Sequence, residues 1–228
     1  MRTCVIIPTY NEAKTIAKLI RQIRSQGLEV VVVDDGSADN TSRISQDNGA
    51  LVLRNSNNEG KGASLIRGFI YVLSKDFDAI VTMDGDGQHL PEDILYFTRL
   101  AQYSDSGVFI GNRMLNIKNM PWMRLVTNKF MSWFISTVTK QDIPDTQCGF
   151  RLIKKSVFEK LNLRTTRYET ESELLIEASR LGFKIESVPI KTVYLGAKSQ
   201  INPVLDTLRF IRFIHREIFR RPANINTD

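Results

Sequence analysis

The chain has 228 residues, 42% of them hydrophobic and 25% charged, and a formal net charge of +6. This is the composition of an ordinary globular domain that is long enough to bury a sizeable core. Two cysteines, Cys4 and Cys148, are too few for a disulfide framework, which favours a reducing, cytoplasmic setting. The modest positive excess suits nucleotides, phosphates or an anionic membrane surface without selecting among them.

Membrane insertion is not expected from the sequence. The apolar run within residues 1–8 is shorter than a signal peptide requires. No stretch approaches the roughly 18 apolar residues of a membrane-spanning helix. Any membrane contact is therefore expected to be peripheral, or to come through a membrane-anchoring partner protein.

Short apolar runs alternate with amphipathic segments through the first half of the chain. The expected strands are 3–8, 29–33, 50–53, 79–83 and 107–110. The expected helices are 12–25, 40–48, 61–75 and 92–103. This alternation predicts right-handed βαβ units and a mostly parallel sheet, and the nearly all-apolar strands predict helices on both of its faces.

The pattern loosens after residue 112. The expected elements are an aromatic-rich helix at 123–139, a loop at 142–147, a strand at 149–153, a helix at 171–181, a strand at 184–188 and a basic helix from about 203 to 220. The chain shows no internal repeat and no convincing linker. We therefore predict a single domain over 1–221, followed by a frayed tail at 222–228.

Polar residues directly follow three of the five strands expected in the first half. These segments are Thr-Tyr-Asn-Glu at 9–12, Asp-Asp-Gly-Ser at 34–37 and Asp-Gly-Asp-Gly-Gln at 84–88. Because ligands bind at the carboxyl ends of the strands in parallel sheets, this edge is the expected ligand site.

The third segment places Asp84 and Asp86 on either side of Gly85. Alternating carboxylates can reach one hard cation through oxygen ligands, and Gln88 offers a further neutral oxygen. The glycine also allows a bulky diphosphate to approach the backbone. The plain alternative is an acidic turn that caps the next helix, but a strand end close to other acidic residues favours catalysis.

Other metal and nucleotide motifs fit poorly. An EF-hand would need glycine and glutamate where the sequence has His89 and Leu95. Residues 60–65 begin like a dinucleotide fingerprint but lack its third glycine and its distant acidic residue, so Lys61 is either close to a phosphate at a helix N-terminus or solvated. Neither a dehydrogenase nor an ATPase is supported. No motif typical of nucleic-acid binding accompanies the basic residues.

Six motifs occur in one order along the chain. They are Pro-Thr-Tyr-Asn-Glu at 8–12, Asp-Asp-Gly-Ser at 34–37, Asn-Glu-Gly-Lys-Gly at 58–62, Asp-Gly-Asp-Gly-Gln at 84–88, Gly-Asn-Arg at 111–113 and Asp-Thr-Gln-Cys-Gly-Phe-Arg at 145–151. Together they resemble the dolichyl-phosphate mannose and glucose synthase group of the second inverting glycosyltransferase family. The resemblance runs from about residue 4 to residue 209. Its last motif is closer to the glucose type, which leans toward a UDP-sugar over a GDP-sugar.

This resemblance implies an α/β GT-A fold, with a mostly parallel central sheet and helices on both faces. It also implies a nucleotide-sugar donor, a polyprenyl or dolichyl phosphate acceptor, and Mg²⁺ or Mn²⁺ as cofactor. Residues 1–112 would form the half that binds the nucleotide-sugar. Residues 113–221, with the basic C-terminal helix, would form the half that binds the acceptor.

The resemblance also implies contacts for the nucleoside. Pro8, Tyr10 and Glu12 would line its pocket, and Val33 and Asp35 would contact the base or ribose.

Around the diphosphate, the resemblance implies that Asp84, Gly85 and Asp86 meet the donor and the metal, and that Gln88 completes the cation shell. Arg113 and Arg124 match positions that hold phosphate. Lys198 matches a basic residue near the donor.

Displacement at the anomeric carbon requires a stabilised leaving group. A cation at Asp84 and Asp86 would neutralise the departing diphosphate, and Arg113 or Lys198 would add fixed positive charge. A phosphate acceptor is already anionic and needs no base, whereas a glycan hydroxyl would need one, for which Asp145 is the best candidate. A simple turn role for Asp145 is equally open.

Two further residues have open assignments. Arg151 is either a second contact to the acceptor phosphate or a partner of Asp145. His89 carries no visible pairing, so a surface or helix-cap position is expected for it.

Two segments bear on membrane contact. Apolar residues and arginines interleave over 205–221, which suits an interfacial helix on anionic lipid as well as a packed helix with solvated arginines. The aromatic stretch 130–135 is more often core than lipid contact. A hypothesis from another class, a silent nucleotide-binding subunit, is opposed by the intact Asp84, Asp86 and Gln88.

Overall fold

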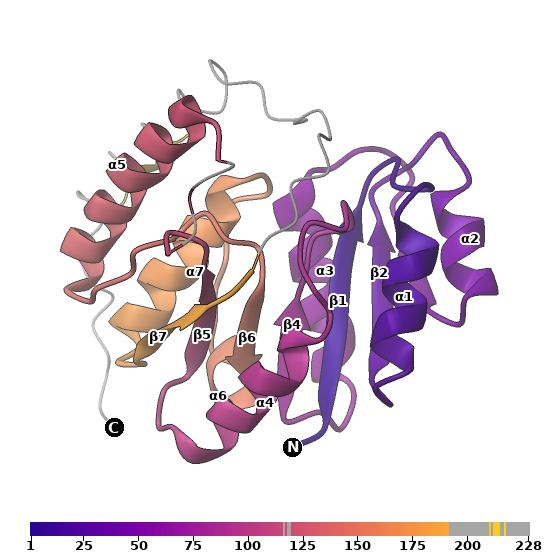
Figure 1. Ribbon diagram of the computed structural model, residues 1–228, viewed down its shortest axis with the longest axis horizontal. Helices are drawn as coiled ribbons and strands as arrows, with labels where there is room; N and C mark the ends of the chain where they lie inside the picture. Colours follow the sequence, from indigo (N-terminus) through magenta and orange to yellow (C-terminus); the bar gives the residue numbers. More distant parts are fainter. Residues whose placement is uncertain (116, 118–119, 192–209, 211, 215–216, 218–228) are drawn as a thin grey trace. The chain divides into compact units, whose positions relative to one another are not determined.

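A computed structural model describes residues 1–115, 117, 120–191, 210, 212–214 and 217. The elements in chain order are β1 (Thr3–Thr9), α1 (Ile16–Arg24), β2 (Glu29–Asp34), α2 (Thr41–Asp47), β3 (Leu51–Arg54), α3 (Lys61–Leu73), β4 (Ala79–Thr82), α4 (Asp93–Tyr103), β5 (Val108–Asn112), α5 (Trp122–Thr139), β6 (Arg151–Lys154), α6 (Lys155–Phe158), α7 (Glu169–Arg180) and β7 (Ile185–Pro189) (Figure 1). The chain divides into two compact units, Met1–Ala197 and Lys198–Asp228, and all of these elements belong to the first.

The seven strands form one sheet in the order β3-β2-β1-β4-β6-β5-β7. Neighbouring strands run parallel except at β6, which is antiparallel to both β4 and β5. The prediction of a mostly parallel α/β sheet is confirmed.

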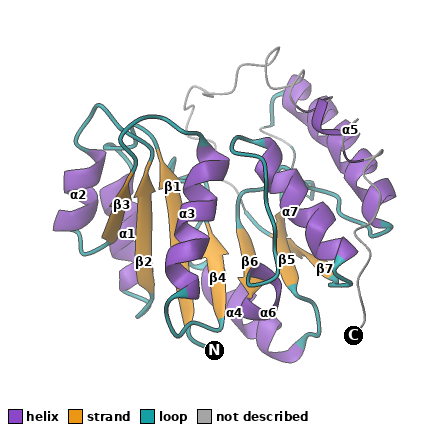
Figure 2. Ribbon diagram, turned by 180° about the vertical axis from the view of Figure 1, so that it is seen from behind, coloured by secondary structure: helices purple, strands orange, loops and turns teal. Residues whose placement is uncertain are grey.

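Helices cover both faces of the sheet, which explains why its strands are so apolar. Helix α3 packs on β1 and β2, and α1 and α2 contact β2. Figure 1 shows α1 in front of the sheet, and Figure 2 shows α3 in front of the opposite face. Every residue of β1 is buried, as are five of the six residues of β2. The burial of these apolar strands under the helices contributes hydrophobic stabilisation that holds the layers together.

Several element boundaries differ from those expected. The first helix begins at Ile16 rather than at residue 12, because the carbonyl of Glu12 closes a turn with the backbone N–H groups of Thr15 and Ile16. Strand β6 begins at Arg151 rather than at 149. The short helix α6 was not expected at all.

Two predictions concern parts of the chain that the structure hardly describes. The basic helix expected at 203–220 is described only at 210, 212–214 and 217, and the tail 222–228 and Lys198 lie outside the described residues. Among the residues that are described, no helix is both long enough and apolar enough to cross a membrane.

Candidate active site

The strand order identifies where a ligand would bind. From β1 the chain continues to β2 and β3 on one side, whereas β4 pairs with β1 on the other side. Open α/β sheets bind ligands at the carboxyl ends of the strands where the order reverses in this way. The segments that follow β1 and β4, residues 10–12 and 83–89, meet at this point.

Gly85 brings these two segments together. A Cβ atom at Gly85 would lie 2.9 Å from Cγ2 of Thr9 and 3.3 Å from Cγ of Glu12. The Thr15 hydroxyl donates a hydrogen bond to the Gly85 carbonyl at 2.6 Å. The glycine is therefore required by the packing of the two loops, a reason that the sequence pattern alone did not reveal.

Asp84 is held from two sides. Nζ of Lys61 lies 2.6 Å from its Oδ1, and Nε2 of His89 lies 3.7 Å from its Oδ2. Gly149 passes so close that a Cβ there would lie 2.6 Å from Oδ2 of Asp84. Burial would raise the pKa of Asp84, but the charge of Lys61 and the contacts with His89 and Lys61 together outweigh burial and lower that pKa well below its usual range. Asp84 is therefore a carboxylate at neutral pH.

Lys61 is in the site and not solvated. Its Nζ lies 3.1 Å from Oε2 of Glu171 as well as 2.6 Å from Asp84. Burial would lower the pKa of Lys61, but the two carboxylates raise it above its ordinary value. The start of α3 packs against the segment before α7. There the Ala63 N–H donates a hydrogen bond to the Thr166 carbonyl at 2.9 Å. This packing delivers Lys61 to both acids.

Asp86 and Glu12 are acids whose charge is poorly compensated. Burial raises the pKa of Glu12 to about 7, and the charge of Asp86 adds to the effect. Burial, followed by the charge of Asp84, also raises the pKa of Asp86. The Gln88 N–H donates to Oδ1 of Asp86 at 3.0 Å, so Gln88 contributes to the loop through its backbone. A cation at this point would relieve the repulsion among these groups.

The carboxylates of Asp84 and Asp86 suit a magnesium-like ion whose other ligands come from a substrate. In the described part of the chain, no group of three or more His, Cys, Asp or Glu side chains is arranged to hold a metal. Asp84 and Asp86 thus offer two carboxylates, and the other ligands would be diphosphate oxygens and water. Mg²⁺ is commonly bound in this way, through one or two carboxylates and substrate phosphates.

Asp145 pairs with Arg113. The backbone N–H, Nε and a terminal nitrogen of Arg113 donate to the Asp145 carboxylate at 2.9, 2.7 and 2.8 Å, and Nδ2 of Asn128 donates at 2.7 Å. Four hydrogen bonds fill the acceptor positions of a carboxylate that is fully buried. Burial would raise the pKa of Asp145, but the bonds from Arg113 lower it. This geometry favours a positioning role for Asp145 over that of a general base.

Arg151 supports the backbone. Its guanidinium donates to the carbonyls of Cys148, Glu171 and Thr146 at 2.9, 2.6 and 3.0 Å, and the residue is 1% exposed. This placement argues against the predicted contact of Arg151 with an acceptor phosphate, because the guanidinium hydrogens already bind buried carbonyls. Since Asp145 pairs with Arg113, it also argues against Asp145 as the partner of Arg151.

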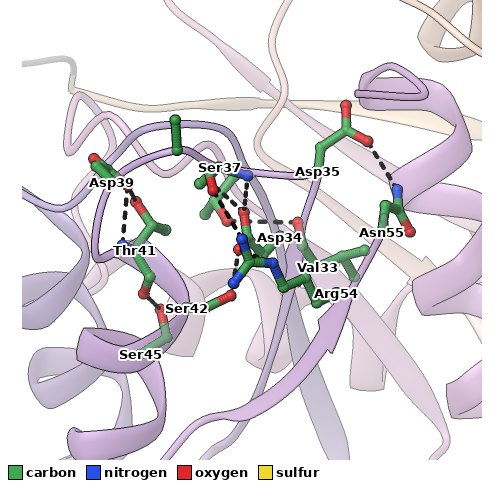
Figure 3. Close-up of polar contacts among 12 residues, drawn as sticks. Val33, Asp34, Asp35, Ser37, Asp39, Thr41, Ser42, Ser45, Arg54 and Asn55 are labelled. Atoms are coloured by element: carbon green, nitrogen blue, oxygen red, sulfur yellow. Dashed lines mark hydrogen bonds and ion pairs between the residues drawn. The ribbon is translucent and has the colours of Figure 1, made fainter. Parts of the chain in front are cut away.

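The residues expected around the nucleoside lie at the ends of β1 and β2. Pro8 and Val33 are buried and face each other in register. Tyr10 and Glu12, just beyond β1, are half-buried. The Asp35 carboxylate accepts hydrogen bonds from Nδ2 of Asn55 at 2.8 Å (Figure 3) and from the backbone N–H groups of residues 59 and 60 at 2.9 and 2.8 Å. Asp35 therefore fixes the loop that leads into α3.

The neighbouring Asp34 shapes the loop after β2. The Ser37 N–H donates to its Oδ1 at 3.0 Å, and the hydroxyls of Ser37 and Ser42 also donate to this fully buried carboxylate (Figure 3). Nε of Arg54 lies 3.6 Å from Oδ2 of Asp34. The family resemblance implied a contact for Asp35 and none for Asp34, so this structural role of Asp34 was not predicted.

Residues 4–162 match the family model described as Glycosyl transferase family 2. The chain belongs to this family. It is 32% identical over 213 residues to the UDP-N-acetylglucosamine--dolichyl-phosphate N-acetylglucosaminyltransferase of Methanococcus voltae, a match that covers 83% of this chain and 85% of the relative. It is 31% identical over 205 residues to the polyprenol monophosphomannose synthase of Mycolicibacterium smegmatis, covering 83% of this chain and 76% of that protein.

The fold of this glycosyltransferase also agrees with solved structures. The glucosyl-3-phosphoglycerate synthase of Mycobacterium tuberculosis, crystallised with Mn²⁺ and UDP-glucose, superposes with a TM-score of 0.74. The match covers 97% of this chain and 80% of that chain at 18% sequence identity. The predicted GT-A fold and family membership are thus confirmed.

Two residues of this glycosyltransferase site were missed or misjudged from sequence. Glu171 was seen only as the start of a helix, since nothing local links it to Lys61, which is 110 residues away. His89 was expected at the surface or at a helix cap, without a partner, but it is buried beside Asp84 and stacks on Phe150 with ring centroids 5.6 Å apart. Arg124 lies in the first turn of α5 and is half-exposed.

Proposed function

We propose that this glycosyltransferase transfers a sugar from a nucleoside diphosphate donor, UDP- or GDP-linked, to a polyprenyl or dolichyl phosphate, with inversion at the anomeric carbon. The observation that carries the proposal is the position of Asp84 and Asp86. They lie at the carboxyl end of β4, beside the end of β1, where the strand order reverses. A diphosphate bound there would meet both the carboxylates and Lys61.

The proposed cofactor is Mg²⁺ or Mn²⁺, held by Asp84 and Asp86 together with the donor. Such an ion would act as a Lewis acid that neutralises the departing diphosphate. Lys61 keeps Asp84 ionised and in position, and Arg113, held by Asp145, would add positive charge for the departing diphosphate. Gln88, through its backbone bond to Asp86, fixes the orientation of the second carboxylate.

The state of Asp145 supports a phosphate acceptor. A glycan hydroxyl would have to lose a proton to a base during transfer, and a phosphate monoester would not. Asp145, the best candidate for that base from the sequence, is fully buried. Its carboxylate oxygens already accept hydrogen bonds from Arg113 and Asn128. The relatives named for dolichyl-phosphate and polyprenol monophosphate products favour the same acceptor class.

The proposed acceptor also implies where in the cell the enzyme acts. A polyprenyl phosphate resides in a membrane, so we propose that the enzyme acts as a peripheral protein at the cytoplasmic face of one. A membrane-anchoring partner protein stays a prediction, and nucleic acid is not among the proposed ligands.

The experiment is a transfer assay with labelled UDP- and GDP-sugars, Mn²⁺ and short polyprenyl phosphates. The proposal expects label in the organic phase with one donor class. Label on soluble glycans alone would contradict the lipid acceptor while retaining the donor site. Tight nucleotide binding without turnover on any acceptor would instead support a silent nucleotide-binding subunit.

A further inference from the structure

Helix α5 exposes a stripe of large apolar side chains. Trp122, Val126, Phe130 and Trp133 follow one another at helical spacings of four, four and three residues, with Met123 beside them. These five side chains are between 56% and 71% exposed. The rings of Phe130 and Trp133 lie 6.3 Å apart. We call these five residues the outer face of α5.

The inner face of α5 is buried but mostly polar. Its buried residues are Asn128, Ser132, Ile135 and Thr139, which again follow spacings of four, three and four. Asn128 donates to Asp145 at 2.7 Å, and the Ser132 hydroxyl lies 3.1 Å from that of Thr146. A helix on the surface of a water-soluble domain normally buries its apolar stripe and exposes its polar one. In α5 the buried face is mostly polar and the exposed face carries large apolar side chains, so the outer face is suited to an apolar partner.

The charge around this face indicates what kind of partner it is. From residue 113 to residue 140 the sequence contains five Lys or Arg residues and no Asp or Glu. Of these, Lys129 is exposed and Arg124 half-exposed on α5 itself, and the exposed Lys140 follows its last turn. Tryptophan, phenylalanine and basic side chains on one helix are the features of a helix that lies in the interface of an anionic bilayer.

We propose that the outer face of α5 docks on an anionic lipid surface, with its aromatic side chains among the headgroups. A second copy of this chain is a poorer partner, because joining two such faces would bring their basic residues together without acidic ones to match. The purpose of the docking rests on the proposed function, but the docking itself is tested by binding alone. A failure of sugar transfer and a failure of docking are therefore distinguishable.

The inner face links this surface to the site. Because Asn128 bonds Asp145 directly, the lipid surface and the Asp145–Arg113 pair would be separated by about one helix diameter, ~10 Å. A phosphate headgroup at the bilayer surface would then come close to the Asp145–Arg113 pair without leaving the membrane. The docking face thereby becomes part of substrate delivery.

The chain provides its own reporter for this proposal. Its only two tryptophans, Trp122 and Trp133, both belong to the outer face. We expect their emission to shift to the blue when the full chain is mixed with vesicles of phosphatidylcholine containing about 30% phosphatidylglycerol, and brominated lipid to quench it. The shift should weaken with pure phosphatidylcholine and at high salt, because screening removes the attraction of the basic residues.

Vesicle flotation with variants completes the test. Phe130→Ser retains both tryptophans and should weaken binding about tenfold, because one large apolar side chain no longer leaves water. Ile70→Ser is the matched control, since Ile70 is 64% exposed on a different helix, α3, and it should bind as the parent does.

Three outcomes would overturn the proposal. One is the absence of both flotation and emission shift with anionic vesicles. The second is flotation without an emission shift, which would assign membrane binding to another part of the chain. The third is an emission shift that grows with protein concentration in the absence of vesicles and accompanies a dimer mass, which would make the outer face a contact between copies.

Discussion

Two pairs of aspartates lie at the carboxyl ends of the strands on either side of β1, and they have different roles. Asp34 ends β2 and Asp35 follows it, and their buried carboxylates accept hydrogen bonds that fold the loops around them. Asp84 and Asp86 follow β4 and are partly exposed, with Asp84 bound to Lys61 and Asp86 poorly compensated. The two motifs look alike in sequence, but Asp34 and Asp35 hold the loops in place, whereas Asp84 and Asp86 leave carboxylate oxygens available to a ligand.

The largest expected effect is a loss of transfer activity, which distinguishes the Asp84–Asp86 pair from the Asp34–Asp35 pair. Asp86→Ala should reduce metal-dependent transfer by about 10²–10³-fold, because it removes one of the two proposed cation ligands. Its free energy of unfolding should stay constant or rise slightly, since the fold already disfavours the charge of Asp86. Initial rates and urea unfolding measure both quantities. Full activity in this variant would contradict the assignment of the site.

The converse variant is Asp34→Asn. It should lower the free energy of unfolding by about 2–3 kcal/mol, because buried hydrogen bonds to a charged acceptor become weaker or unsatisfied. Urea titration measures the loss, and Asp47→Asn is a control in an exposed position. An unchanged midpoint for Asp34→Asn would show that this pair does not hold the loops together.

Lys61→Met tests the ion pair between Lys61 and Asp84. Asp84 would lose the nearby cation that lowers its pKa, so we expect kcat/KM to fall about tenfold to a hundredfold. Glu171→Gln removes the other partner of Lys61 and should have a smaller effect, because Asp84 retains its bond. An equal effect of the two variants would indicate that Lys61 acts on Glu171 rather than on Asp84.

The smallest expected effect concerns Glu12 and pH. Its pKa of about 7 in the fold exceeds its ordinary value, so folding disfavours the ionised form. The fold is therefore unaffected by this group below about pH 4.5 and loses stability as pH rises through about 7. Glu12→Gln should stabilise the protein at pH 8 by about 1 kcal/mol, a value discounted for partial solvent exposure, and by much less at pH 5.

Thermal melting at the two pH values measures this difference. Glu159→Gln, on an exposed glutamate, controls for the loss of one negative charge. A Glu12→Gln gain that is equal at pH 5 and pH 8 would contradict a raised pKa.

Sequence reasoning predicted the sheet and the site edge because both depend on local patterns. Apolar strands and polar strand ends repeat at regular spacing, and the acidic motif at 84–88 stands directly after a buried strand. What it could not predict depends on contacts between distant segments. Glu171 reaches Lys61 only because α3 and α7 pack together.

The same limit applies to side chains whose burial a linear pattern does not reveal. Arg151 was expected either to contact the acceptor phosphate or to pair with Asp145, but its position at the start of β6 buries it among carbonyls. Helix α5 was expected to place its aromatic residues in the core, yet Phe130 and Trp133 are exposed while Asn128 is buried. The burial of Asn128 follows from its bond to Asp145, and the burial of Arg151 from its bonds to backbone carbonyls, neither of which a linear pattern shows.

Binding of Mn²⁺ followed by electron paramagnetic resonance tests the central claim most directly. With only two carboxylates in place, we predict weak Mn²⁺ binding alone and much tighter binding in the presence of UDP or GDP, with the tight phase lost in Asp86→Ala. Tight Mn²⁺ binding that needs no nucleotide, or that persists unchanged in Asp86→Ala, would contradict a cation shared between this loop and a donor diphosphate.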